Sequence, residues 1–367
     1  MTAQLDGDTG TVSKDTLLRW CLAASSILFT LLLLEAGLRV QALMRQRASE
    51  VAWQNLGTPR LPPVQRGNVT LPQLIRPSSN PKVIYELIPN QTVQFCDQQV
   101  TVNALGFRGP AVDTIKPPGT KRIVGLGDSV MFGWGVGDAE YYLALIAERL
   151  ARAAPGHIVE VINSAVPGYN TVMEVETLEE KLLPFTPDVV VIDYVVNDLD
   201  LPNFLDQPLS PFSVDHLFLH DFVAARLAGR AWDPAHRLAG APHDPFRDRR
   251  FEGNPDRVPT QYRALVGIEA YRAAMSELKT LSVTQHFAAV VFSRGRFPDD
   301  IAAVCNELGL PMESAWPAIE RYLNEHGIER YQESALARSA RDPHPSALGH
   351  RVMADVLSDY LERAGLP

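Results

Sequence analysis

The chain has 367 residues, of which 46% are hydrophobic and 21% are charged, a balance typical of a globular protein with a sizeable core. The net charge of −9, without a stripe of basic and aromatic residues, excludes a nucleic-acid-binding surface. The three cysteines have no metal-binding spacing, and only Cys96 and Cys305 could pair, because Cys21 lies in an apolar segment.

Residues 17–40 predict a membrane-spanning helix that follows an acidic N-terminal tail, residues 1–16. The stretch from Trp20 to Leu34 carries no charge, and with its flanks it reaches the roughly 20 residues that cross a bilayer. A buried helix is rarely apolar on every face. A cleaved signal peptide has a short basic start and a small-residue cleavage site, neither of which is present here. We therefore favour an uncleaved single-pass anchor.

The flanking charges give a small preference for the orientation of this anchor. Lys14 and Arg19 precede the span, whereas Arg39, Arg45 and Arg47 follow it. The positive-inside rule thus slightly favours a cytoplasmic C-terminal part, by a margin of one residue.

Residues 41–80 predict a semi-stiff linker, because the stretch is rich in proline, glutamine, arginine and asparagine. Residues 81–120 change character. Short strand patterns at 83–85, 92–95 and 100–102 alternate with turns, which predicts a small β-rich lead-in that packs on the main domain.

Residues 121–367 predict one large α/β domain. Strand patterns at 122–127, 158–162, 188–195 and 288–293 alternate with helix patterns at 139–153, 172–183, 262–282, 298–308, 315–326 and 347–363. The 188–195 strand is almost continuously apolar, as in a parallel strand covered on both faces. The alternation therefore predicts a doubly wound parallel sheet. It stops between 199 and 260, an insertion with one possible helix near 215–229, which is either a lid at the functional edge or a surface excursion.

A serine follows the first of these strands, in Gly127-Asp128-Ser129. The segment is neither a dinucleotide loop, because Val130 stands at the third glycine position, nor a hydrolase elbow, because residue 131 is methionine. A serine on a tight strand-to-helix turn can act as a nucleophile, with backbone N–H groups near a bound oxyanion. Taken alone, a serine that merely caps a helix is the favoured interpretation, because serine caps are common.

Two further segments end at the same edge of the predicted sheet. Gly168, in a Pro-Gly turn after the second strand, allows a close approach to its backbone N–H, and Asn197 follows the third strand with a side-chain amide that can donate to a developing negative charge. Considered alone, an ordinary Pro-Gly turn is the favoured explanation of the Gly168 segment, and turn initiation by Asn-Asp explains the Asn197 segment at least as well as a functional role does.

The segment Asp342-Pro343-His344-Pro345 supplies a possible base. Residues before proline favour extended backbone, in which positions i and i+2 face the same side, so the carboxylate and the imidazole can meet. His344 could then accept the serine proton while Asp342 orients the ring, as in a Ser-His-Asp triad. A solvent-exposed loop histidine is the plain alternative. His350, inside the next helix, is expected to be a packing or surface residue.

Together, the serine, glycine, asparagine and aspartate/histidine blocks make the sequence resemble the SGNH (GDSL-like) hydrolase superfamily from about Ile123 to the last helix. The resemblance implies a flavodoxin-like three-layer α/β/α fold. It also implies Ser129 as nucleophile, His344 as base, and an oxyanion hole made by the N–H groups of Ser129 and Gly168 and the Asn197 amide. Asp342 would be the orienting acid.

The sequence departs from the pattern of this superfamily at two positions. Val195 replaces the usual glycine two residues before the asparagine, and the acid stands two residues before the histidine instead of three. The first departure is tolerable if the Asn197 side chain is still presented, and the second makes Asp342 the least secure member of the set.

The function that these residues predict is hydrolysis of an acyl ester, most simply an acetyl ester of a glycan or lipid, without a metal or organic cofactor. An O-acyltransferase acting on a cell-envelope polysaccharide would use the same residues, and an inactive membrane-anchored glycan-binding or scaffold protein could share the fold. The resemblance to the family favours an extracytoplasmic catalytic domain, although the charges that flank the anchor slightly favour a cytoplasmic one. The sequence does not indicate a protein partner.

Overall fold

The computed structural model describes residues 13–54, 68–153, 158–201, 212, 217–227, 253, 255 and 260–366. The chain divides into two compact units. The first comprises Met1–Glu50 and Gln207–Pro242, and the second comprises Val51–Asp206 and His243–Pro367.

The first unit contains most of the long helix α1 (Lys14–Gln54) and the short helix α6 (Phe218–Leu227), which corresponds to the helix expected near 215–229. The Lys14–Met44 part of α1 is long and apolar enough to cross a membrane, with a mean hydropathy of 2.0, a property that an N-terminal signal sequence shares. The helix continues past residue 40 to Gln54, because residues 41–54 contain no proline or glycine and include several good helix formers. The expected linker therefore begins as helix. Most of the rest of the insertion lies outside the described residues.

The second unit is built on a five-stranded parallel sheet, which confirms the predicted α/β fold. Its strands are β6 (Thr120–Leu126), β7 (Ile158–Asn163), β8 (Val189–Asp193), β9 (Ala288–Ser293) and β10 (Met312–Ser314), and they lie in the order β10-β9-β8-β6-β7. This is the flavodoxin-like order, in which ligands bind at the carboxyl edge of the strands. β10 has only three residues, too few to give a sequence pattern.

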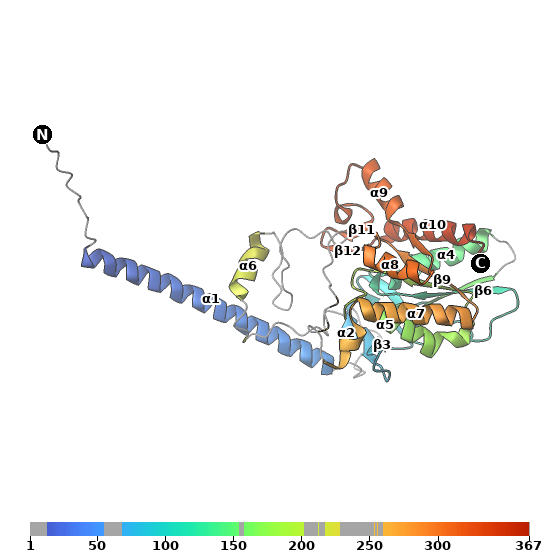
Figure 1. Cartoon of the computed structure of the whole chain (residues 1–367), viewed down its shortest axis with the longest axis horizontal. Coiled ribbons are helices and arrows are strands. Elements are labelled where there is room, and N and C mark those ends of the chain that lie inside the picture. The colour runs from blue at the N-terminus through green and yellow to red at the C-terminus, as the bar shows by residue number, and fades with distance from the viewer. Residues whose placement is uncertain are drawn as a thin grey trace. The chain divides into compact units, whose positions relative to one another are not determined.

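Two hydrophobic clusters cover the two faces of this sheet. Along β8, Val189 and Val191 belong to one cluster, whereas Val190 and Ile192 belong to the other. This alternation follows from the period of two in a strand. Figure 1 shows the resulting layers, with α4 (Tyr142–Ala153) and α10 (Ala347–Arg363) on one side of the sheet and α5 (Thr171–Thr177) and α7 (Ile268–Thr284) on the other. Two further helices of the second unit are α8 (Asp299–Glu307) and α9 (Trp316–Glu325).

A β-rich segment precedes the sheet, as the sequence predicts. β1 (Asn68–Val69), β4 (Gln91–Phe95) and β5 (Gln98–Val102) form one small sheet, while β2 (Ile75–Pro77) and β3 (Tyr85–Leu87) form an antiparallel pair. The one-turn helix α2 (Leu71–Leu74) connects β1 to β2. β1 and β2 fall within residues 68–77, ahead of the start of the lead-in expected at residue 81.

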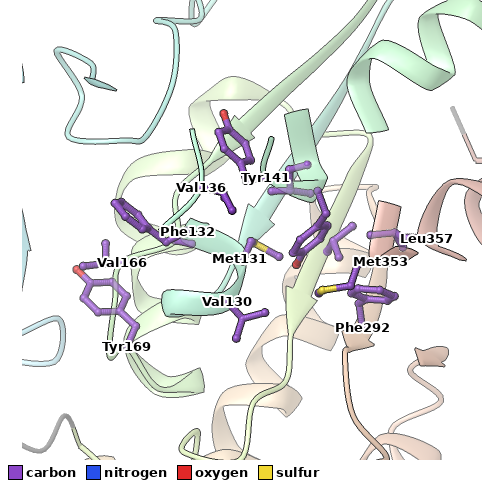
Figure 2. Packing of buried hydrophobic residues seen from close by; sticks show 14 of the residues in the cluster. Val130, Met131, Phe132, Val136, Tyr141, Val166, Tyr169, Phe292, Met353 and Leu357 are labelled. Atoms are coloured by element: carbon purple, nitrogen blue, oxygen red, sulfur yellow. The ribbon is translucent and has the colours of Figure 1, made fainter. Parts of the chain in front are cut away.

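The short helix α3 (Ser129–Phe132) directly follows β6 and is fixed by buried side chains. Figure 2 shows Val130, Met131 and Phe132 pointing in different directions, each into another part of the packed cluster. A helix held on three sides cannot turn about its axis, so its first residue, Ser129, has a fixed position.

Candidate active site

Ser129 lies on a turn whose sequence is set by sterics and capping. The Asp128 side chain accepts a hydrogen bond from the N–H of Val130 at 2.8 Å and so caps α3. A Cβ atom on Gly127 would lie only 2.6 Å from the Cβ atom of Met131, so glycine alone lets the helix fold back this closely on the strand end. The turn leaves the Ser129 side chain partly exposed at the carboxyl edge of the sheet.

Ser129, His344 and Asp342 form a continuous hydrogen-bonded chain. Oγ of Ser129 lies 2.8 Å from Nε2 of His344, and Nδ1 of His344 lies 2.6 Å from Oδ1 of Asp342. The backbone N–H of His344 donates to the same carboxylate oxygen at 3.2 Å. Both residues lie on the extended strand β12 (Asp342–Pro345), so the spacing of two brings acid and imidazole together.

The Asp342 carboxyl is charged at neutral pH. Partial burial opposes its ionisation, but hydrogen bonds and charge from His344, together with the charge of Arg338, lower its pKa to about 2. A carboxylate bonded to Nδ1 places the ring proton on that nitrogen, which leaves Nε2 free to accept the proton of Ser129.

Three residues that the sequence did not single out hold His344 and its neighbours in place. Nη1 of Arg338, on β11 (Ala337–Ser339), donates to Oδ2 of Asp342 at 2.6 Å. Nη1 of Arg294, after β9, donates at 2.6 Å to the backbone carbonyl between Asp342 and His344. The Trp134 ring stacks on the imidazole, with centroids 5.2 Å and planes 17° apart. These contacts depend on a hairpin and on loops distant in sequence, so no local pattern signals them.

Asn197 lies beside the serine turn. Its Nδ2 donates to Oδ2 of Asp128 at 3.0 Å, and the Ser129 hydroxyl lies 3.4 Å from the same oxygen. An amide nitrogen has two hydrogens, so one remains for another acceptor. Val195, which replaces the usual glycine, therefore does not prevent the amide from reaching the serine turn.

Gly168 lies on a loop that is joined to the serine turn. The N–H of Val166 donates to the carbonyl of Gly127 at 3.1 Å. Gly168 has a φ of 85°, a conformation that favours glycine. Within the described parts of the chain, the N–H groups of Gly168 and Ser129 donate to no other residue.

The β-rich lead-in supports this glycine loop. The Tyr85 hydroxyl, from β3, donates to the carbonyl of Pro167 at 2.8 Å, and the Tyr169 hydroxyl donates to the carbonyl of Tyr85. Tyr85 and Tyr169 are almost fully buried, and their rings meet edge to face at 5.3 Å. The lead-in thus fixes the backbone on both sides of Gly168.

Four buried carboxyl groups lie behind the site, on Asp128, Glu174, Asp193 and Asp198, and burial raises the pKa of each. Asp198 accepts a hydrogen bond from the Thr171 hydroxyl at 2.9 Å and makes none with His344. Among the described residues, neither oxygen of Glu174 has a hydrogen-bond partner. No sequence pattern indicates this acidic interior.

The structure also shows the state of His350 and of the two cysteines that could pair. His350 is completely buried and stacks on Tyr142 at 5.9 Å, and burial lowers its pKa to about 3, so it is a packing residue. Cys96 and Cys305 are free thiols. Among the described residues, no group of three His, Cys, Asp or Glu side chains could hold a metal ion.

Comparison with known proteins gives one family match. The sequence model of the GDSL-like lipase/acylhydrolase family matches residues 126–352. No curated protein sequence matches the chain significantly.

Several solved structures are similar to the second unit's fold. One is a catalytic mutant of an acetylxylan esterase from Geobacillus stearothermophilus, with 15% identity, a TM-score of 0.39, and coverage of 67% of this chain and 95% of that chain. Another is a two-domain esterase active on acetylated mannans, with 17% identity, a TM-score of 0.42, and coverage of 66% of this chain and 49% of that chain. A third is a putative lipolytic protein of the G-D-S-L family from Desulfitobacterium hafniense, with 10% identity, a TM-score of 0.38, and coverage of 65% of this chain and 98% of that chain.

Proposed function

The chain belongs to the GDSL-like lipase/acylhydrolase family of ester-hydrolysing enzymes, and from this membership we propose that it is a serine esterase that forms an acyl-enzyme on Ser129. The observation that carries the proposal is the contact chain from Ser129 Oγ to His344 Nε2 and from His344 Nδ1 to Asp342, at 2.8 and 2.6 Å. A nucleophile, a base and an orienting acid are thereby in hydrogen-bond reach of one another.

The proposed reaction has two steps. His344 accepts the proton of Ser129 as Oγ attacks the ester carbonyl, and it then donates this proton to the leaving alcohol as the carbon–oxygen bond breaks. Water, activated by the same imidazole, releases the acid and restores Ser129. Asp342 keeps its charge throughout and stabilises the imidazolium form of His344.

The proposed oxyanion hole consists of the N–H groups of Ser129 and Gly168 and the second amide hydrogen of Asn197. The two backbone groups are held rigidly, one on α3 and the other on the loop that Tyr85 supports. Donors fixed in advance need no rearrangement when charge develops on the carbonyl oxygen, and this lowers the barrier.

The proposed substrate is an acetyl or other acyl ester of a glycan or lipid at the cell envelope. The organisation that fits this role is a tail (1–16), an anchor (17–40), a linker and lead-in (41–120) and an extracytoplasmic catalytic domain (121–367) with its insertion. The apolar part of α1, with a mean hydropathy of 2.0, supports the anchor.

A fluorophosphonate probe tests the nucleophile in the full chain. The probe forms a bond to Ser129 Oγ with loss of fluoride, and Ser129→Ala should abolish both labelling and hydrolysis of 4-nitrophenyl acetate. Ser276→Ala, at an exposed position on α7, is the matched control and should retain both. Labelling or turnover retained in Ser129→Ala would overturn the proposal, and an unlabelled parent protein would indicate a scaffold.

A panel of acyl esters, assayed with and without an acceptor sugar, separates hydrolysis from acyl transfer. An esterase releases the free acid at the same rate in both conditions. Acylated sugar as the main product would instead identify an O-acyltransferase that uses the same residues.

A further inference from the structure

In the first unit, α6 begins against α1 at a specific polar contact. The carboxylate of Glu35, on α1, accepts hydrogen bonds from the backbone N–H groups of Phe218 and Leu219 at 3.1 and 2.7 Å. These N–H groups belong to the first turn of α6 and have no partner within that helix. Arg39 donates to the same carboxylate at 2.8 Å, and its guanidinium lies 5.3 Å from the centre of the Phe218 ring. A negative charge at a helix N-terminus is stabilising, so this contact fixes where α6 starts.

Beyond this contact, the two helices line an apolar groove of about 590 Å³. Figure 1 shows α6 starting beside α1 and then diverging from it. The volume falls within the roughly 300–1,000 Å³ that is usual for sites that bind small molecules. The apolar walls include Leu28, Leu31 and Leu32 of α1 and Leu219, Val223 and Leu227 of α6.

The groove is continuous with the exposed apolar surface of α1. Leu28 is 59% exposed and Leu227 is 85% exposed, and the exposure of large apolar side chains continues along α1 from Leu17 to Leu34. Water disfavours such a surface by roughly 25 cal/mol for each Å² of apolar area. Because the same helix is long and apolar enough to cross a bilayer, hydrocarbon is the environment that this surface fits.

The position of the groove along α1 matches one leaflet of a membrane. From Glu35 back to Leu28 the helix advances about 10 Å, at ~1.5 Å per residue, compared with a hydrocarbon core of about 30 Å. The charged pair of Glu35 and Arg39 then lies near the interface, and the groove extends from it towards the middle of the bilayer. An extended hydrocarbon chain has the shape and polarity to fill it.

We propose that the groove between α1 and α6 binds an acyl chain of a bilayer phospholipid, so that the α6 part of the insertion is docked in the membrane beside the anchor. This inference is separate from the ester chemistry and depends on α1 crossing the bilayer.

Photocrosslinking in vesicles tests the proposal directly. The full chain carries benzoylphenylalanine in place of Val223 and is reconstituted in palmitoyl-oleoyl phosphatidylethanolamine and phosphatidylglycerol, illuminated, and analysed by mass spectrometry. The same photoreactive residue in place of Leu28 reports on the anchor. In place of Ile115, which is 85% exposed in the second unit, it is the control for chance collision with lipid. Hydrolysis of a soluble ester by each variant verifies that it is folded.

We expect a phospholipid adduct at Val223 and Leu28 and none at Ile115. Glu35→Ala should reduce the Val223 adduct about tenfold or more, because charge-assisted hydrogen bonds to α6 are lost, while the Leu28 adduct persists. Glu35→Gln, which retains an acceptor oxygen, should keep most of the Val223 adduct.

Three results would overturn the proposal. An adduct at Leu28 without one at Val223 would place α6 outside the bilayer. An adduct between two protein chains at Val223 would make a second copy the occupant. Absence of lipid at both positions would show that α1 itself is not in the membrane.

Discussion

Replacing Asp342 by asparagine should stop turnover for a reason that involves Arg338 as much as His344. The two oxygens of Asp342 accept hydrogen bonds from different donors, Nδ1 of His344 and Nη1 of Arg338, each at 2.6 Å. Asparagine has only one acceptor oxygen, and its amide nitrogen can only donate. If that oxygen stays on Arg338, the amide nitrogen faces His344, whose Nδ1 must then accept, and the ring proton moves to Nε2.

A proton on Nε2 prevents His344 from accepting the proton of Ser129. The loss expected for this wrong tautomer is about 10⁴-fold in kcat, or ~5.5 kcal/mol of transition-state stabilisation. The opposite amide orientation keeps the correct tautomer but places two donors together at Arg338, at a cost of roughly 1–3 kcal/mol. Arg338 therefore biases the Asp342→Asn variant towards the inactive arrangement.

The assay is hydrolysis of 4-nitrophenyl acetate by the single variants Asp342→Asn and Arg338→Ala and by the double variant. Removing Arg338 frees the asparagine to turn its oxygen to His344, so the double variant should be about 10- to 100-fold more active than Asp342→Asn alone. Asp198→Asn, on a carboxyl bound to Thr171, should cost far less than Asp342→Asn. The reasoning is wrong if Asp342→Asn stays within tenfold of the parent, or if the double variant is no more active than the single one.

Three further measurements, two of them on new variants, test the surroundings of the serine. Asn197→Ala should lower kcat about 10²- to 10³-fold, as expected for one oxyanion donor, and an unchanged kcat would remove this amide from the hole. Asp342 has its pKa lowered from 3.8 to about 2 in the folded state, so the stability that it contributes is complete above pH 4 and disappears as the pH falls towards 2. Acid unfolding of Asp342→Asn followed by circular dichroism should therefore be less steep in that window, and an identical curve would contradict the assignment. Glu174 is buried, has no hydrogen-bond partner in the part of the chain that the structure describes, and has a pKa that burial raises above 4.5. Its contribution to the free energy of unfolding therefore falls as pH rises, by at most about 1.4 kcal/mol per pH unit. In urea unfolding, Glu174→Gln should therefore be more stable than the parent at pH 8, and the difference should be smaller at pH 5. A larger gain in stability at pH 5 than at pH 8 would contradict the raised pKa of Glu174.

The sheet was predictable because its strands carry their own signal. β8 is apolar from Val189 to Ile192 because helices cover both faces of the sheet, and β6, β7 and β9 lie close to the expected ranges. β10 was not predictable, because three residues cannot establish a period. The expected linker at residues 41–80 begins as helix, because residues 41–54 contain no proline or glycine and include several good helix formers, and the first proline of the stretch is Pro59.

Within the site, local backbone rules predict one contact of the histidine, the one with Asp342, but not the long-range contacts. The proximity of Asp342 and His344 follows from Pro343 and Pro345, because each proline keeps the residue before it extended. The bond between Ser129 and His344 joins residues 215 positions apart, and its distance of 2.8 Å depends on how β6 and β12 are placed. The bond from Tyr85 to the loop of Gly168 likewise has no sequence signature, because a buried tyrosine resembles any other core aromatic.

The sequence by itself determined the alternating strands and helices, the long apolar N-terminal helix and the identity of the serine, glycine, asparagine and histidine blocks, because each depends on neighbours a few residues away. Only the tertiary structure decided that Arg338 and Arg294 hold the histidine strand, that Asp128 joins Ser129 to Asn197, and that Glu35 receives the start of α6. These contacts join charged or polar groups on different segments of the chain. They form only where the packing of the core holds both backbone segments in place. Local sequence patterns can thus identify the candidate catalytic residues, whereas the groups that orient these residues become apparent only in the tertiary structure.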